Sequence, residues 1–343
     1  MTRIAERSPA PFVSVIVPAY NVSAYLVEAL DSLRAQTLAD IEILVIDDGS
    51  NDDTLALARA AAAEDPRIRV IARLTPSGRP SCARNDGLRA ARGTYIALLD
   101  ADDIAMPTRL ESAVAAMQLT GARFAFSDAQ RLYESTGKKA AAGTLALAKF
   151  TEIAAPYLQH VSGNLYLCSR SFPAFLLTYV AIGTSTVVFH RDLLPAESTW
   201  FDETLICFED LDYWFRLAEH TPFVFVNEMH TIVRKHLDSL TGTTPTATRI
   251  DGIAVRKAHL ERLRSRMSPA EQSAAAQNIS ALQFHVAYAE RCAGHASSAR
   301  RWFAASWRTS PTVAAAMGVI KSFLPRPGGY DMHEPPRTPG DNR

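Results

Sequence analysis

Acidic side chains gather in two short stretches of the sequence, each directly after an apolar run. Asp47 and Asp48 follow one run, and Asp100, Asp102 and Asp103 follow another. Carboxylates that meet at one place raise one another's pKa unless a cation lies between them. Carboxylate-rich sites with few other ligands suit Mg²⁺ or Mn²⁺, which keep part of their water shell and bind a substrate's phosphates. The two stretches therefore predict a divalent-metal site that also holds phosphate.

A structural interpretation of the single residues stays open beside this one. Asp is common in turns and at helix caps, and both Asp52 and Asp103 can be explained as caps. A D-x-D pair such as Asp100 and Asp102 also occurs by chance in many proteins. Acids at the ends of two separate apolar runs are harder to explain in this way, and they favour a functional site.

Strand and helix patterns alternate through the first 130 residues of the chain. Compact apolar or β-branched runs predict strands, at 12–17, 41–46, 68–72, 94–99 and 123–127. Helical spacing predicts helices between them, at 23–35, 52–63, 81–91 and 107–119. Such alternation is typical of an α/β fold with a largely parallel sheet. If the second and fourth strands flank the first, both acidic stretches meet at the carboxyl edge of the sheet, where ligands bind.

The pattern loosens after about residue 131. The uncharged stretch 171–189 contains Pro173 and Gly183, which favours a buried strand–loop–strand over a membrane span. A helix is expected at 209–218, and short strands are expected at 223–226 and 231–233.

The C-terminal part divides into three stretches by composition. Residues 241–248 are polar and include Pro245, so they are a candidate linker. Helical spacing of apolar residues follows over 250–324, and a hairpin is expected to turn near Gly294. The repeated Pro and Gly of 325–343 predict a disordered tail.

Composition excludes several classes of protein. The 343 residues suffice for about two domains with a buried core. Lys plus Arg and Asp plus Glu both number 36, so no net charge favours nucleic acid as a partner. The four cysteines lie far apart, and the first residues lack the apolar region of a signal peptide, so a reducing cytoplasm is expected. The absence of G-x-G-x-x-G, P-loop and G-x-S-x-G motifs argues against dinucleotide, kinase-like and hydrolase chemistry.

Six segments in order, at ordinary spacing, together resemble the family 2 glycosyltransferases. They are VSVIVPAYN at 13–21, VIDDGSNDDT at 45–54, SCARNDGLRAARGTYIALLDADD at 81–103, TSTVVFHRDLL at 184–194, FEDLDYWFRLA at 208–218 and VRKHLDSLT at 233–241. The resemblance covers about residues 11–242 and implies a catalytic domain with the GT-A fold. This fold is a Rossmann-like mixed, mostly parallel sheet flanked by helices, here followed by a helical C-terminal region over 250–324. One segment departs from the family, because Ser77-Gly78-Arg79-Pro80 stands where relatives often have Asn-x-Gly.

The resemblance implies transfer of a sugar, of hexosyltransferase type, from a nucleotide-sugar donor to an acceptor hydroxyl with inversion at the anomeric carbon. Pro18, Tyr20 and Asp48 would line the nucleobase pocket. Asp48 would accept a hydrogen bond from a uracil-type N–H, which favours a UDP-sugar. Arg84 would contact the nucleotide or its diphosphate, and Asp100 would lie near the ribose and the sugar.

The resemblance also assigns the chemical roles. Asp102 would bind Mn²⁺ or Mg²⁺ bridging the two phosphates, His236 would contact that metal or the diphosphate, and Asp210 would be the general base. The chemistry agrees, because a metal ion offsets the charge that builds on a diphosphate leaving group. A carboxylate on the opposite face can take the acceptor proton. One base without a second, nucleophilic carboxylate fits a single displacement, from which inversion follows.

Structural alternatives remain for these residues. An acid such as Asp210 in a first helical turn is favoured by the helix dipole alone. His236 can be an ordinary surface histidine, Arg84 a solvated helix residue, and Tyr20 a side chain that packs on the sheet edge.

Two other functions also stay open. One is a non-catalytic nucleotide-sugar binding module. The other is a nucleotidyltransferase, which normally needs a Gly-rich basic loop that residues 18–23 lack.

The expected acceptor is a glycan or a lipid-linked molecule, in glycan, polysaccharide or glycolipid biosynthesis. Acceptor specificity is expected from residues 150–182, which match the family poorly. The C-terminal helices are expected to pack as a small subdomain. The alternative is an amphipathic, Arg-flanked surface at 300–307 and 313–324 for a membrane or a partner. The expected location is cytoplasmic, with peripheral contact at the inner membrane face left open.

Overall fold

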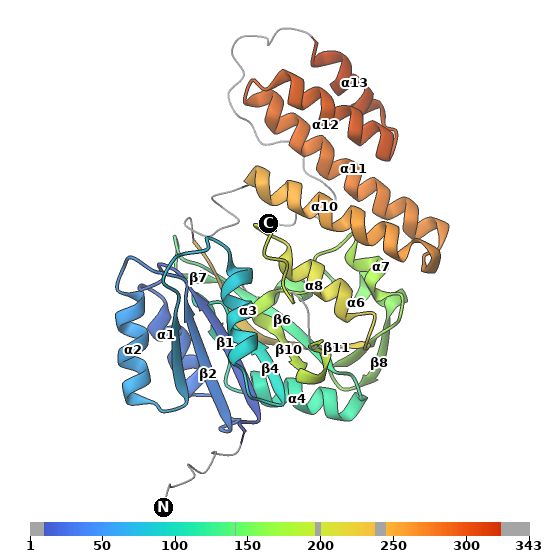
Figure 1. The fold of residues 1–343 in the computed structure, drawn as a ribbon. Helices are drawn as coiled ribbons and strands as arrows, with labels where there is room; N and C mark the ends of the chain where they lie inside the picture. The colour runs from blue at the N-terminus through green and yellow to red at the C-terminus, as the bar shows by residue number, and fades with distance from the viewer. Residues whose placement is uncertain (1–9, 141, 196–199, 237–244, 324–343) are drawn as a thin grey trace, which may run out of the picture. The chain divides into compact units, whose positions relative to one another are not determined.

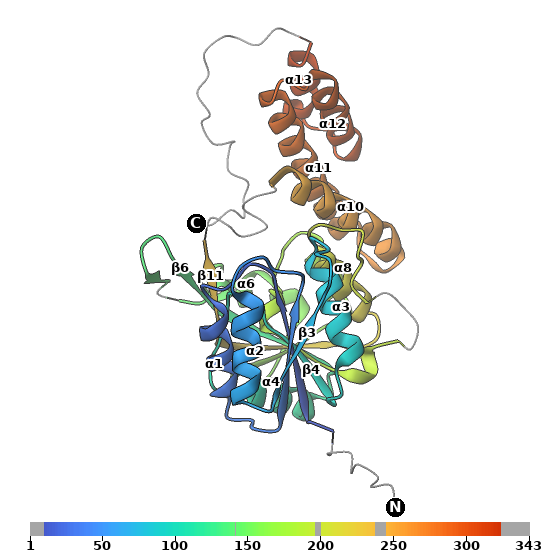
Figure 2. The ribbon, with the colours of Figure 1, turned by 60° about the vertical axis from the view of Figure 1, so that its left-hand side comes forward.

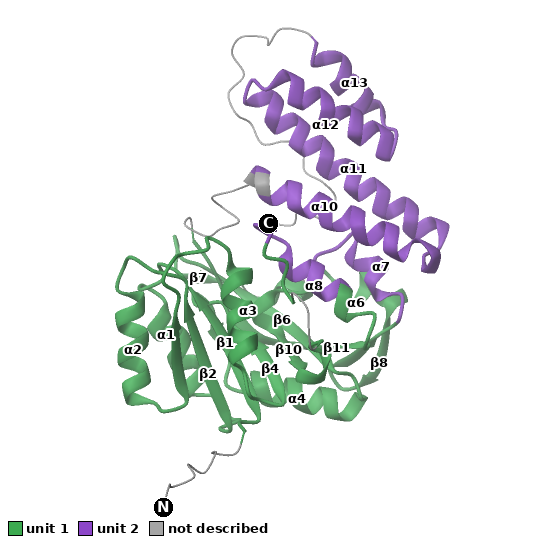
Figure 3. Cartoon of the chain, in the orientation of Figure 1, with its two compact units in different colours: residues 1–169, 182–203, 216–236 green, residues 170–181, 204–215, 237–343 purple. Residues whose placement is uncertain are grey.

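The computed structural model describes residues 10–140, 142–195, 200–236 and 245–323. The chain divides into two compact units, shown in Figure 3. Unit 1 comprises residues 1–169, 182–203 and 216–236, and unit 2 comprises 170–181, 204–215 and 237–343.

Neither unit is a continuous stretch of chain, and the predicted domain limits at 242 and 250 stay predictions. The predicted tail at 325–343 and the start of the predicted linker, 241–244, lie outside the described residues.

The sheet of unit 1 has eleven strands in the described residues, in the order β3-β2-β1-β4-β10-β6-β11-β9-β8, with β5 beside β11 and β7 beside β6 (Figure 1). The strands are β1 (Val13–Ala19), β2 (Ile41–Asp47), β3 (Ile68–Ala72), β4 (Tyr95–Leu98), β5 (Ile104–Ala105), β6 (Phe124–Tyr133), β7 (Lys138–Lys139), β8 (Leu158–Ser162), β9 (Leu165–Cys168), β10 (Val187–His190) and β11 (Phe223–Lys235). Strands β3, β2, β1 and β4 are parallel, and β10 runs antiparallel between β4 and β6. The predicted α/β class is confirmed, and β2 and β4 flank β1 as expected.

Helices cover both faces of the parallel strands. The helices and 3₁₀ turns of unit 1 are α1 (Leu26–Arg34), α2 (Thr54–Glu64), α3 (Pro80–Ala90), α4 (Arg109–Thr120), α5 (Thr144–Leu147), α6 (Phe150–Ile153), η1 (Ala155–Tyr157), η2 (Thr184–Thr186) and η3 (Arg191–Leu193). Val15 of β1 and Leu30 of α1 belong to the same buried hydrophobic cluster on one face. On the other face, a Cβ on Gly87 of α3 would lie 2.4 Å from Ile16. Figure 2 shows α1 and α2 on one side of the strands and α3 on the other. Burial of both faces explains why the strands read as continuous apolar runs.

Two expected elements differ in the structure. The stretch 171–189 does not begin with a strand, because Phe172–Leu176 forms helix α7 with Pro173 in its first turn, a position that suits proline. Only its end, in β10, is a strand. The two strands expected at 223–226 and 231–233 are one strand, β11, whose irregular register between Val226 and Thr231 interrupts the apolar pattern.

The described residues of unit 2 are mainly helical. Their helices and 3₁₀ turn are α7, α8 (Glu209–Leu217, up to residue 215), α10 (Pro245–Leu263), η4 (Arg264–Arg266), α11 (Pro269–Cys292), α12 (Ala296–Thr309) and α13 (Val313–Lys321). The expected turn at Gly294 is confirmed, with a φ of 89° that favours glycine.

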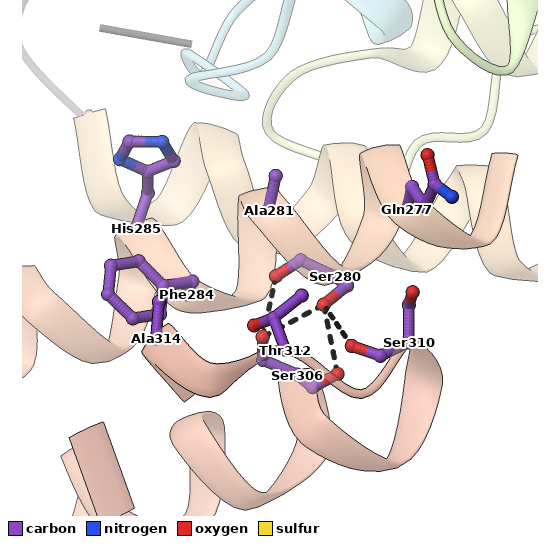
Figure 4. Close-up of a pocket in the computed structure, with 9 residues that line it drawn as sticks. All are labelled: Gln277, Ser280, Ala281, Phe284, His285, Ser306, Ser310, Thr312 and Ala314. Carbon is purple, nitrogen blue, oxygen red and sulfur yellow. Dashed lines mark hydrogen bonds between the residues drawn. The ribbon is translucent and has the colours of Figure 1, made fainter. Parts of the chain in front are cut away.

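Figure 4 shows a pocket beside Ser280 of α11. The Ser280 hydroxyl forms hydrogen bonds with Ser306 and Ser310 there, and none of the predicted site residues lines this pocket. No helix in the described residues is long and apolar enough to cross a membrane.

A buried carboxylate ties three segments of unit 1 together. Glu42 of β2 is 2% exposed and accepts hydrogen bonds from the Ser14 hydroxyl at 2.6 Å and from Arg69 at 2.8 Å. The backbone N–H and guanidinium of Arg92 donate to it as well. Burial alone would raise the pKa of Glu42, but these hydrogen bonds together lower it below the ordinary value of 4.5.

The variant Glu42→Gln is expected to lower the free energy of unfolding by about 2 kcal/mol at pH 7, because hydrogen bonds to a charged group are lost. The lowered pKa means that the carboxylate stabilises the fold fully above pH 4.5 and less as the pH falls below it. Urea unfolding at pH 7 and pH 3 should therefore show the difference from wild type shrinking at acid pH. The exposed Glu64→Gln is the control, with an expected effect of about 0.5 kcal/mol or less. A pH-independent difference would contradict the charge-based explanation.

Candidate functional site

The loops after β1 and β2 form a joined rim at the carboxyl ends of these strands. Four hydrogen bonds link the loops, from Asn21 N–H to Ser50, Val22 N–H to Thr54, Ser23 N–H to Asp52 and Asn51 N–H to Asn21. Pro18 is half-buried within β1, and Tyr20 beyond it is 46% exposed. The Tyr20 ring is therefore open to solvent, while these hydrogen bonds hold the neighbouring backbone in place. A role in stacking on a base requires such an exposed ring.

Asp48 is buried and already bound by the protein itself. Its carboxylate accepts hydrogen bonds from the Ser77 N–H and hydroxyl and from the Gly78 N–H. The Nε of Arg73 lies 2.8 Å from it. Asp48 thus anchors the segment in which the sequence departs from the family, and its nucleobase role stays a prediction.

Arg84 and Asp100 are brought together as a pair. Arg84 of α3 is 4% exposed, and its Nη2 lies 2.8 Å from Asp100 Oδ1. The guanidinium also lies 5.6 Å from the centre of the Phe201 ring. The Asp100 N–H donates to the hydroxyl of Ser185. The alternative of a solvated Arg84 is therefore wrong.

Asp102 and His236 form the second pair, joining the end of β4 to the residue after β11. Asp102 Oδ2 lies 2.9 Å from His236 Nε2, and the Tyr25 ring lies 5.0 Å from the imidazole. Burial raises the pKa of Asp102, and the charge of Asp100 adds to this, while His236 opposes it. The alternative of an ordinary surface histidine is wrong for His236, whose side chain is 9% exposed.

Asp103 points inward and holds the loop rather than a ligand. It is 4% exposed and accepts the backbone N–H of Arg234 at 3.0 Å. Burial raises its pKa well above the ordinary value, and the charges of Asp102 and Asp100 add to the effect. The helix-cap interpretation is wrong, because α4 is preceded by Thr108 at its N-cap.

Arg109 of α4 supports this loop from within the core. Its side chain is buried and donates to the carbonyl oxygens of Leu98 and Val187. Burial lowers the pKa of Arg109 to about 10, and the nearby Asp103 opposes that shift. The sequence does not distinguish this buried arginine from an exposed one in an ordinary helix.

The acidic stretches are thus partly neutralised by the protein's own cations, Arg73 at Asp48 and Arg84 at Asp100. Within the described residues, no group of three or more His, Cys, Asp or Glu could hold a metal ion by itself. The Asp102 carboxylate nevertheless fits Mn²⁺ or Mg²⁺, which prefer oxygen ligands, and the His236 imidazole lies beside it. Burial and the charge of Asp100 raise the pKa of Asp102 and so disfavour its carboxylate form, a cost that a bound cation would offset. Phosphate and water would complete the ligand set.

Asp210 belongs to unit 2, whereas the other predicted site residues belong to unit 1. It lies in the first turn of α8, and its Oδ1 accepts the N–H of Leu211 at 2.6 Å. Tyr213 and Trp214 are fully buried, so α8 is a rigid support. The role of Asp210 as general base stays a prediction.

Comparison with known proteins gives one family match. Residues 14–163 match the model described as glycosyl transferase family 2. Among curated relatives, the succinoglycan biosynthesis protein ExoO of Rhizobium meliloti is 33% identical over 200 residues, 58% of this chain and 53% of that protein. The uncharacterized glycosyltransferase EpsJ of Bacillus subtilis is 50% identical over 93 residues, 27% and 26% of the two chains. The chondroitin synthase of Escherichia coli is 41% identical over 101 residues, 29% and 14% of the two chains. The chain thus spans about half or less of these relatives' own length.

Solved structures show the same fold. TarS 1–349 of S. aureus, in complex with UDP-GlcNAc, has a TM-score of 0.60 and 17% identity, over 91% of this chain and 89% of that one. The mannosyltransferase PcManGT of Pyrobaculum calidifontis, in complex with GDP-Man and Mn²⁺, has a TM-score of 0.53 and 17% identity, over 92% and 80%. The predicted GT-A fold with C-terminal helices is therefore confirmed.

Proposed function

Since residues 14–163 match the model of glycosyl transferase family 2, we propose that the protein transfers a sugar from a nucleotide-sugar donor to an acceptor hydroxyl. The observation that carries this is the pairing of Arg84 with Asp100 and of His236 with Asp102 beside the rim that bears Tyr20. The pairs lie at the carboxyl edge of the parallel strands, the usual ligand position in such sheets. Relatives named for succinoglycan biosynthesis and chondroitin synthesis support a role in polysaccharide biosynthesis.

In the proposed mechanism, the rim holds the nucleotide, with the base on Tyr20 and the diphosphate at Arg84. The UDP-GlcNAc complex of TarS supports a UDP-sugar as the donor. Asp102 and His236 would hold Mn²⁺ or Mg²⁺, which offsets the charge developing on the leaving diphosphate. The Mn²⁺ complex of PcManGT supports this metal dependence.

Asp210 takes the proton of the acceptor hydroxyl as that oxygen attacks the anomeric carbon. A single displacement opposite the leaving group inverts the configuration at that carbon. A glycan or a lipid-linked molecule is the proposed acceptor, and the proposed location is cytoplasmic. Membrane contact through the C-terminal helices stays an open alternative. Exposed Trp307, Val313 and Phe323, and the lack of Asp and Glu in 292–323, support the membrane contact.

The expected result that tests donor binding is a rise in Tm with a UDP-sugar plus Mn²⁺. At a hundredfold excess over Kd, a ligand specific for the folded state stabilises it by about 2.7 kcal/mol, which is a shift of several degrees. The measurement is thermal unfolding of the full chain against a panel of nucleotide sugars, with Mn²⁺ or with a chelator. An unchanged Tm with every nucleotide sugar at millimolar concentration would contradict the proposed function.

A further inference from the structure

Helix α10 contacts the chain segment that leads into α8, and both belong to unit 2. Oδ2 of Asp251 accepts the backbone N–H groups of Ile206 at 2.7 Å and Cys207 at 3.1 Å. A third contact joins Cys207 Sγ to the Thr248 hydroxyl at 3.3 Å. One carboxylate of α10 thus fixes two successive peptide groups just before the turn into α8.

The turn itself is strained and is covered by the next turn of α10. Phe208 has a φ of 64°, a left-handed conformation that is strained for a bulky residue and persists only when its surroundings enforce it. The guanidinium carbon of Arg256 lies 5.0 Å from the centre of the Phe208 ring, in a cation–π contact. Arg256 is 5% exposed, and its Nη1 donates to the Gly252 carbonyl at 3.0 Å.

Gly252 allows this close approach. A Cβ at that position would lie 2.8 Å from the Phe208 ring and 3.1 Å from Arg256 Nη1. One helical turn beyond Arg256, His259 Nε2 lies 2.8 Å from Asp212 Oδ1, and its ring stacks on Phe215 at 4.4 Å. Gly252, Arg256 and His259 therefore form one face of α10 that packs along the start of α8.

Asp210 lies in sequence between Phe208 and Asp212, which both contact α10. Burial lowers the pKa of Arg256 to about 10, and the charge of Asp210 opposes that shift, so the two groups interact electrostatically. Asp212 is paired with His259. The other charged groups on α8 and α10 are Glu209, Arg216, Arg249, Asp251, Lys257, Glu261 and Arg262. Arg256 thus places a positive charge near the Asp210 carboxylate while its own side chain stays buried.

We propose that Arg256 and Asp251 of α10 are positioning residues for Asp210, which hold the Phe208 turn and so fix where the carboxylate lies. The inference rests on the proposed function, in which Asp210 is the general base. The family match ends at residue 163 and does not include these residues. Displacement of a reacting group by about 1 Å can cost about a hundredfold in rate, so even a small relaxation of the turn matters.

The test compares Arg256→Met with Arg256→Lys in the full chain, using the nucleotide sugar found in the donor panel. Arg256→Met is expected to lower kcat by about 10- to 100-fold while the donor KM stays unchanged. The rising limb of the pH–rate profile should move to higher pH, because loss of a nearby cation disfavours the carboxylate form. Arg256→Lys should restore the position of that limb but only part of kcat, since lysine lacks the planar guanidinium.

Lys257→Met is the matched control, because Lys257 is the next residue of α10 and is exposed.

If Arg256→Met does not fold, the variants Asp251→Ala and Asp251→Asn test the proposal in its place. The alanine removes the acceptor for the N–H groups of Ile206 and Cys207 and should lower kcat at constant donor KM, whereas the asparagine keeps an acceptor and should restore it.

Two outcomes separate the inference from the function on which it rests. If Asp210→Asn is inactive but Arg256→Met and Asp251→Ala both retain the kcat of Lys257→Met, the positioning inference is overturned and the proposed function stands. If Asp210→Asn keeps full activity, the assignment of the base is wrong, and the positioning inference falls with it.

Discussion

Asp210→Asn is expected to abolish sugar transfer almost completely, by about 10²- to 10⁴-fold, while donor binding stays nearly intact. The amide has the shape of the carboxylate and can still accept the Leu211 N–H, so the start of α8 is preserved. It cannot take a proton from the acceptor, because an amide oxygen is too weak a base. The measurement is the initial rate of nucleoside diphosphate release with acceptor present, together with the donor Kd from calorimetry.

The control for this prediction is Asp40→Asn, an exposed acid that should leave both quantities unchanged. A variant that lost donor binding together with activity would point to a structural role for Asp210. Donor binding without turnover in the wild type, with any acceptor tried, would favour a nucleotide-sugar binding module instead.

Asp102→Asn is expected to weaken donor binding in the presence of Mn²⁺ at least tenfold, or about 1.4 kcal/mol. The asparagine keeps a partner for His236 Nε2, so the loop geometry should survive, but the charge that attracts the cation is lost. Calorimetric titration of the donor with Mn²⁺ and with a chelator measures the effect, which should vanish when the metal is removed.

The exposed Asp53→Asn at the start of α2 serves as the control for nonspecific loss of negative charge. If Asp102→Asn retains the metal dependence of the wild type, the Asp102–His236 pair is not the metal site.

The parallel strands could be predicted from sequence because burial on both faces leaves a direct signature. β1 and β2 are almost entirely buried, and each appears as a short apolar run. The stretch that became α7 has the same composition, and short apolar runs do not distinguish a strand from a buried helix. Pro173 lies in the first turn of α7, and proline in such a position is a local signal that favours a helix start.

Sequence reasoning could predict the site residues only where they are neighbours in the chain. The acids at the end of β4 are neighbours in sequence, but the pairing of Asp102 with His236 crosses 134 positions and was suggested only by the family resemblance. Partners from other segments, such as Ser77 at Asp48 and Arg256 near Asp210, left no local signal. A buried arginine and a solvated one look the same in a sequence, and only packing separates them.

The most direct test is a crystal structure of the full chain with a UDP-sugar and Mn²⁺, with the ion located by its anomalous scattering. The predicted result is a Mn²⁺ ion bound by Asp102 and His236. The diphosphate oxygens should also bind this ion, with Arg84 beside them. An ion and phosphates bound elsewhere, or neither bound at saturating concentrations, would contradict the account.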